Sequence, residues 1–197
     1  MADNEHGHDG EATAVEAAED ERDAERLARK RIAFAQIRQY SDPVLRMRAG
    51  EVEVFDEELA RLVERMTVLM HDADGVGLAA TQVGILRRFF VFSIDGQDGV
   101  LVNPVLTRVD GELESDEEGC LSLGSVRVPV ERQVKVTIEG KDASGGDVKL
   151  ELEGIGARIV QHELDHLDGV LIIDRTDAAS RKEAMAQLRP RLLLAGR

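Results

Sequence analysis

The feature that most restricts this chain is the stretch 161–166, which reads Gln-His-Glu-Leu-Asp-His. On an α-helix, His162 and His166 are one turn apart and leave from the same face, so both imidazoles can bind one metal ion. Glu163 lies about 100° further round the helix, where it can reach a water molecule at the metal more easily than the metal itself. The pattern predicts a helix with two metal ligands and a general base. Because the pattern also arises by chance, it needs a third ligand.

Cys120, the only cysteine of the chain, is the best candidate for that ligand. A lone cysteine is usually a small buried hydrophobe, but here two histidines with metal spacing lack a partner. In some zinc peptidases a further histidine extends the motif, and the corresponding position holds Ile172. Glu183 is the only glutamate after the motif. We therefore expect Cys120 as the third ligand, with an open fourth position for water, and keep Glu183 as the alternative.

A third segment, 75–84, reads Gly-Val-Gly-Leu-Ala-Ala-Thr-Gln-Val-Gly. It has neither the Gly-Lys-Ser/Thr ending of a phosphate loop nor a Gly-x-Gly-x-x-Gly pattern, so we exclude a nucleotide site there. A tight loop packed on a sheet, with Gln82 solvating its end, is the plain interpretation.

Together these stretches resemble the peptide deformylase family. The three motifs occur in the family's order at 75–82, 118–122 (Glu-Gly-Cys-Leu-Ser) and 161–166, with flanking matches at 40–46, 103–104 and 169–171. The resemblance covers about residues 37–175. One departure is Gly124, where many members have proline, which changes the stiffness of the loop but not a ligand.

The resemblance implies a hydrolase that removes the formyl group from the N-terminal formyl-methionine of nascent peptides and releases formate. It implies that Cys120, His162 and His166 bind the metal and that Glu163 is the general base and then the acid. One thiolate and two imidazoles would favour zinc on chemical grounds. The resemblance instead implies Fe(II), with zinc, nickel or cobalt as alternatives.

The resemblance also implies an oxyanion hole, formed by the side chain of Gln82 and the backbone N–H of Leu121. An apolar slot would receive the methionine side chain, and backbone groups near the first motif would pair with the extended peptide. The implied substrate-binding residues are Val76, Gly77, Glu118, Arg127, Ile155 and Ile159. Ordinary core packing is the alternative for the two isoleucines, and Glu118 could instead orient its loop.

Two other functions stay open. A zinc peptidase that cleaves internal amide bonds would use Glu183 as a ligand and would not need Cys120. A non-catalytic, metal-bound or ribosome-associated relative would need neither Glu163 nor Gln82.

Charge is distributed unevenly along the 197 residues of the chain. Residues 1–25 hold ten acids and one arginine, so they carry −9 of the total −14. We expect an acidic, disordered or weakly helical tail over 1–30, with His6 and His8 solvated, and a single catalytic domain over 31–197. The basic segment 175–197 is either a solvated helix face or a transient contact with ribosomal RNA.

No run of 18 apolar residues and no signal peptide is visible, so we expect no membrane contact, and nothing indicates DNA binding. One cysteine cannot form an internal disulfide, which favours a reducing compartment, most simply the cytoplasm.

The periodicity predicts an α+β fold, with small mixed or antiparallel sheets packed around a central helix that carries the His-Glu-x-x-His motif. A helix should begin after Asp56, since apolar residues follow it at intervals of three and four. Strands are predicted at 87–94, 100–107, 126–139 and 147–153, separated by turns at 95–96 and 144–147. The motif helix should span 155–167 and stop at Gly169. A short strand at 170–174 and a final helix, capped at Asp177 and weakened by Pro190, should follow.

Overall fold

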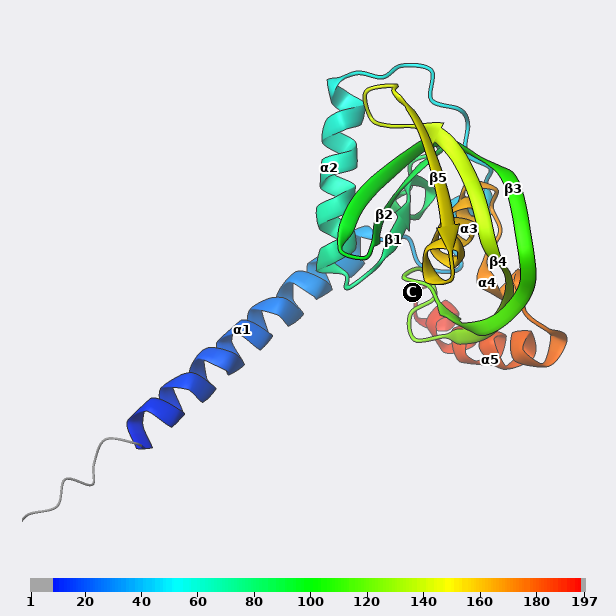
Figure 1. Cartoon of the computed structure of the whole chain (residues 1–197). Helices are drawn as coiled ribbons and strands as arrows, with labels where there is room; N and C mark the ends of the chain where they lie inside the picture. Colours follow the sequence, from blue (N-terminus) through cyan, green and yellow to red (C-terminus); the bar gives the residue numbers. More distant parts are fainter. Residues whose placement is uncertain (1–8, 196–197) are drawn as a thin grey trace, which may run out of the picture.

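The computed structural model describes residues 9–195 and the side chains of residues 21–189 (Figure 1). The elements in chain order are α1 (Asp9–Gln36), η1 (Pro43–Arg46), α2 (Glu57–Asp72), β1 (Gly77–Ala79), η2 (Ala80–Val83), β2 (Phe89–Ile94), β3 (Gln97–Gly119), β4 (Arg127–Lys141), β5 (Asp147–Glu153), α3 (Ile155–Leu167), α4 (Ile172–Arg175) and α5 (Ala178–Ala195).

The strands form one five-stranded antiparallel sheet in the order β1-β2-β3-β4-β5. The turn between β2 and β3 is the predicted Asp95-Gly96 pair, and both residues have positive φ (52° and 75°), as a two-residue type I′ hairpin turn requires. β3 and β4 are long and curve around α3 (Figure 1). Three register shifts in their ladder accompany this bend, since each extra residue kinks a strand. The predicted α+β fold is therefore confirmed, with a sheet that is antiparallel throughout its five strands.

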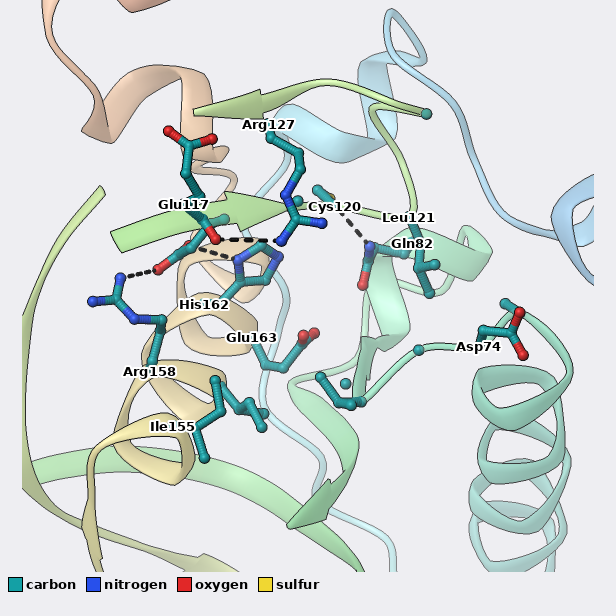
Figure 2. Close-up of a pocket in the computed structure, with 18 of the residues that line it drawn as sticks. Asp74, Gln82, Glu117, Cys120, Leu121, Arg127, Ile155, Arg158, His162 and Glu163 are labelled. Atoms are coloured by element: carbon teal, nitrogen blue, oxygen red, sulfur yellow. Dashed lines mark hydrogen bonds and ion pairs between the residues drawn. The ribbon is translucent and has the colours of Figure 1, made fainter. Parts of the chain in front are cut away.

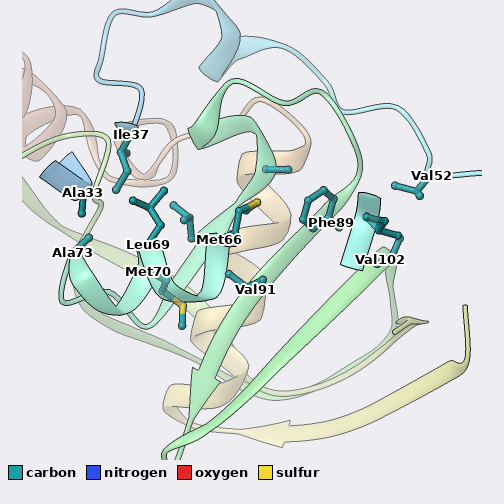
Figure 3. Close-up of a cluster of buried hydrophobic side chains, with 13 residues drawn as sticks. Ala33, Ile37, Val52, Met66, Leu69, Met70, Ala73, Phe89, Val91 and Val102 are labelled. Atoms are coloured by element: carbon teal, nitrogen blue, oxygen red, sulfur yellow. The ribbon is translucent and has the colours of Figure 1, made fainter. Parts of the chain in front are cut away.

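β2 contacts both α2 and α3, which pack on opposite faces of the sheet. Its successive side chains point to alternate faces, so each helix meets every second residue. Phe89 and Val91 point into a cluster with Met66 and Met70 of α2 (Figure 3). Phe90 and Phe92 belong to the opposite cluster, which contains Ala157, Val160 and Leu167 of α3. The motif helix thus has its apolar side buried in the concave face of the sheet. This burial fixes the direction in which its polar side chains leave.

The predicted helix ends are largely confirmed. Asp56 caps α2 by accepting a hydrogen bond from the backbone N–H of Leu59 at 3.0 Å. α3 ends at Leu167, and Gly169 follows it with a φ of 72°. Asp177 caps α5 through the N–H groups of Ala179 and Ser180.

The strand predicted at 170–174 is wrong, because Ile172–Arg175 form the short helix α4. The apolar run reads as a buried strand, and short apolar runs do not distinguish strand from helix. Asp174 settles the conformation by accepting the N–H of Leu171 at 2.9 Å, which closes the turn, and Ile172 and Ile173 are then buried.

The acidic segment is helical in the structure from Asp9 onward, as the first part of α1, which extends away from the body of the molecule (Figure 1). α1 joins the core only near its end, where Ala33 is buried with Ile37 beside α2. The division of the chain at residue 30 stays a prediction, and His6 and His8 lie outside the described residues. Among the helices that the structure describes, none is both long and apolar enough to cross a bilayer.

Candidate metal centre and catalytic site

The three predicted metal ligands converge at one point, although 42 residues separate Cys120 from His162 in the sequence. Their ligand atoms all lie within 4.8 Å of one another, and Cys120 Sγ is 3.2 Å from His166 Nε2. α3 supplies both histidines, and the loop after β3 supplies the cysteine. Glu183, the alternative ligand, is an exposed residue of α5 and does not belong to this group.

The chemistry of these donors fits a divalent cation. One thiolate and two imidazoles are a donor set that proteins use for transition metals. Burial lowers the pKa of His166 well below its ordinary value, so this ring is neutral, the form that binds a metal. Burial would also lower the pKa of His162, but hydrogen bonds with Cys120 and Glu118 raise it well above the ordinary value. A bound cation would take the place of that proton.

A buried carboxylate orients the first histidine. Glu118 Oε2 lies 2.9 Å from His162 Nδ1, which favours the tautomer with the proton on Nδ1 and Nε2 free for a metal. Arg132 donates two hydrogen bonds of 2.9 Å to the same carboxylate, and Arg158 donates a third of 2.9 Å. Although burial alone would raise the pKa of Glu118, its bonds with His162 and Arg132 lower it to about 2. Glu118 is therefore ionised, and its occupied oxygens favour an orienting role.

The charge network continues below the metal centre. Asp165 of α3 accepts a hydrogen bond from Arg132 at 2.6 Å and two more from Arg175 at 2.6 and 3.0 Å. The sequence interpretation missed Arg132, Arg158 and Asp165. One signal was available: Arg158 lies four residues before His162, and therefore on the face of the motif helix that points to the metal.

Glu163 lies beside the predicted ligands, against β1 (Figure 2). Its side chain is buried, and its Oε2 atom has no hydrogen-bond partner among the described residues. Burial raises the pKa of Glu163 to about 7, so the carboxyl group can hold or release a proton near neutrality. A β-carbon at Gly77 would overlap the Glu163 carboxylate. The second glycine of the first motif therefore makes room for the Glu163 carboxylate.

The two predicted oxyanion groups are held by a single short segment. Gln82 Oε1 accepts the N–H of Ala79 at 2.9 Å, which turns the amide nitrogen toward Ser122 Oγ at 3.2 Å and Cys120 Sγ at 3.7 Å. The N–H of Arg38 donates to the backbone oxygen of Gln82 at 2.7 Å. The side chain of Gln39 donates to the backbone oxygen of Leu121 at 3.0 Å. The two residues Arg38 and Gln39, just after α1, thus fix the backbone of both Gln82 and Leu121. The sequence interpretation missed these two hydrogen bonds.

A cavity of about 400 Å³ opens over this centre. Every predicted site residue lines it except His166, which is buried: Val76, Gly77, Gln82, Glu118, Cys120, Leu121, Arg127, Ile155, Ile159, His162 and Glu163. Val76 and Ile155 expose more than half of their surface, which makes the cavity partly apolar. Gly124, the departure from the family pattern, also lines it and has a φ of 65°, a conformation that proline cannot adopt.

The orienting role of Glu118 leads to a test on metal affinity. Glu118→Gln removes the charge that supports the His162 tautomer, so we expect the dissociation constant of the metal to rise about 10- to 100-fold. Competition with a chromophoric chelator measures it. Glu117→Gln, at the exposed neighbouring position, should leave the constant unchanged. An unaltered constant in folded Glu118→Gln protein would exclude the role.

Comparison with known proteins agrees with this geometry. The profile of the polypeptide deformylase family matches residues 34–182. The peptide deformylase of Thermotoga maritima is 48% identical over 145 residues, which cover 74% of this chain and 88% of the relative. Peptide deformylase 1 of Corynebacterium glutamicum is 45% identical over 162 residues, which cover 80% of this chain and 96% of the relative.

Solved structures of the family share the fold. The crystal structure of the Thermotoga maritima peptide deformylase has a TM-score of 0.70 at 48% identity, over 72% of this chain and 96% of that chain. The crystal structure of a peptide deformylase from Legionella pneumophila has a TM-score of 0.76 at 38% identity, over 82% and 96%. With its three metal ligands gathered under one cavity, the chain belongs to the peptide deformylase family.

Proposed function

We propose that this protein removes the formyl group from the N-terminal formyl-methionine of nascent peptides and releases formate. The observation that carries the proposal is the convergence of Cys120, His162 and His166 at the floor of the cavity, with Glu163 beside them. A divalent cation held by these three residues would supply an activated water nucleophile near neutral pH.

Glu163 is proposed as the residue that moves the proton. It accepts a proton as the water attacks the formyl carbon and donates one to the departing amine. A pKa of about 7 suits both directions of transfer at neutral pH. A bound cation would lower this pKa, and the unpartnered Oε2 atom would then be ready to accept the proton.

Gln82 and Leu121 are proposed to stabilise the charge that develops on the formyl oxygen. The Gln82 amide is already fixed through Ala79, so little reorganisation is needed when the charge forms. The loss of one such donor typically costs about 3 kcal/mol of transition-state stabilisation.

The peptide itself is proposed to bind as an added strand. β1 is an edge strand, paired only with β2, and Gly77 and the two residues before it line the cavity. An extended peptide can therefore pair with this backbone while Val76, Ile155 and Ile159 enclose the methionine side chain. Arg127 is exposed at the rim, where it can meet the peptide backbone or a carboxylate.

The two alternative functions have less support. A zinc peptidase with Glu183 as a ligand would leave the convergence of Cys120 with the histidines unexplained. A non-catalytic relative would have no reason to bury an unpartnered carboxylate, because desolvation of such a group is unfavourable.

Substitution of Glu163 tests the proposed chemistry. Glu163→Ala should lower formate release from formyl-Met-Ala-Ser by at least about 100-fold, since proton transfer is lost, and should leave the metal content near normal. Glu151→Ala, an exposed glutamate of β5, is the matched control and should retain activity. Cys120→Ala should lose the metal, whereas a peptidase that uses Glu183 would keep it.

For the metal, we propose Fe(II), with zinc, nickel or cobalt as possible replacements. Ferrous iron and a liganding thiolate both oxidise, so an anaerobically prepared, iron-loaded sample should lose activity on exposure to air. A zinc-loaded sample treated in the same way is the control. Equal rates before and after exposure would count against iron as the working metal.

We also propose that α5 contacts the ribosome through its exposed cations. Arg175 pairs with Asp165 and Arg181 with Asp174, whereas Lys182 and Arg189 are exposed and form no ion pair with another residue that the structure describes. Phosphate contacts by such side chains would make the binding weaken with salt.

Point variants are the suitable test of this contact, because truncation of α5 would remove Ala184 and Leu188 from the core. Lys182→Glu with Arg189→Glu should reduce salt-sensitive co-sedimentation with ribosomes. Arg61→Glu with Arg65→Glu, an equal charge change on the exposed side of α2, should not. Co-sedimentation that both pairs leave unchanged would exclude the contact.

A further inference from the structure

α1 contributes to the wall of the active-site cavity. Lys30 and Phe34 line the same cavity as His162 and Glu163. Lys30 Nζ donates a hydrogen bond to Asp74 Oδ2 at 2.7 Å, and Asp74 also lines the cavity. The match to the family profile begins at residue 34, so Lys30 precedes the residues that the profile matches.

This wall is held firmly in place. Ala33 and Ile37 of the α1 end region are buried, and Phe34 packs against the same cluster as Leu121. The next residue, Arg38, is bonded to the backbone of Gln82. Lys30 therefore projects from a fixed element rather than from a mobile terminus.

The segment of the chain around Lys30, from residue 26 to residue 38, carries a net positive charge. Residues 26–38 contain five cations and no acid: Arg26, Arg29, Lys30, Arg31 and Arg38. Arg26 lies one turn before Lys30 on the same face. The pKa of Asp74 is lowered chiefly by its hydrogen bond with Lys30, and in smaller part by the charges of Lys30 and Arg26.

Anionic groups near the rim do not cancel this charge for a ligand. Asp74 takes up one of the three N–H donors of Lys30, and the other two remain available. Glu117 also lines the cavity, but Arg127 lines it as well. The acids of α1 nearest to Lys30 are Asp23, which forms an ion pair with Arg26 at 3.7 Å, and Glu25. Asp23 lies about 10 Å before Lys30 along the helix, beyond a screening length of about 8 Å at physiological salt, and Glu25 lies about 140° round the helix from Lys30.

The rim formed by Lys30 and Asp74 lies away from the proposed methionine slot. Ile155, at the proposed methionine slot, and Asp74 lie on opposite sides of the cavity, with Glu163 between them (Figure 2). A cavity of about 400 Å³ is in the range of pockets that hold a whole ligand, about 300–1,000 Å³. If a peptide binds with its first side chain at Ile155 and its formyl group at Gln82, its later residues must lie along another wall of the cavity.

We propose that Lys30, supported by Arg26, is a specificity-determining residue that binds acidic side chains of the substrate peptide beyond its first residue. The inference rests on the proposed deformylase function and deepens it. It assigns a preference for acidic over basic residues at the third and fourth positions to a residue that precedes the segment matched by the family profile.

The experiment compares kcat/KM of the metal-loaded enzyme for formyl-Met-Ala-Glu-Glu and formyl-Met-Ala-Lys-Lys, each divided by the value for formyl-Met-Ala-Ser with the same variant. The parent enzyme should favour the acidic peptide by about three- to fivefold, the range of an exposed ion pair. Lys30→Met should abolish this preference, and Lys30→Glu should reverse it. High salt should suppress the preference of the parent.

Arg31→Glu is the matched control, because it makes the same charge change on α1 about 100° away from Lys30. It should keep the parental preference. The inference is overturned if Lys30→Glu leaves the preference unchanged, if it lowers the rates for all peptides equally, or if Arg31→Glu has the same effect. Failure of the parent enzyme to release formate from formyl-Met-Ala-Ser would instead overturn the proposed function.

Discussion

The interaction on which the site depends is the ionised carboxylate of Glu118, buried between His162 and two arginines. Burial of a charge is favourable only when partners compensate it, and removal of one partner from such a group typically costs about 3–5 kcal/mol. Glu118 lies near the end of β3, two residues before Cys120, whereas Arg132 belongs to β4 and Arg158 to α3. The network therefore ties β3, whose end leads into Cys120, and α3, which carries both histidines, to the neighbouring strand β4. A single set of hydrogen bonds both positions the elements and selects the ring tautomer that leaves Nε2 of His162 for the metal.

The curved sheet provides the low-polarity surroundings that this chemistry needs. Because β3 and β4 wrap around α3, Glu163 and His166 are almost fully enclosed, at 4% and 1% exposure. Enclosure lowers the pKa of the imidazole and raises that of the carboxyl group, so one is a neutral ligand and the other a proton carrier near pH 7. These opposite shifts have one cause, which is that burial disfavours whichever form is charged. The fold thus sets two catalytic properties through one physical effect.

Local sequence signals predicted much of this arrangement. The spacing of His162 and His166, the cap at Asp56 and the Asp95-Gly96 turn each depend on neighbours within a few residues, and the structure confirms them. Features that depend on distant partners were not predictable in the same way. Nothing near Arg132 indicates that it will meet Asp165, and nothing in the apolar run at 170–174 indicates that Asp174 will close a helical turn. Because no local spacing joins Cys120 to α3, its choice as the third ligand came from elimination among the candidate ligands, and the family motifs then agreed with it.

The charged residues at the floor of the cavity depend on one another for stability, whereas those at its rim do not. At the floor, the charges are buried and mutually dependent, so a change in one leaves another uncompensated. At the rim, Lys30 and Asp74 form an exposed pair, and such pairs contribute little to stability. A chain of this family can therefore exchange rim residues with little loss of stability while its metal centre stays fixed. Lys30 of α1 precedes the residues that match the family profile, and Arg38 and Gln39, just after α1, are bonded to the backbone of Gln82 and Leu121. Contacts made there by a substrate act directly on the wall that holds the proposed oxyanion groups.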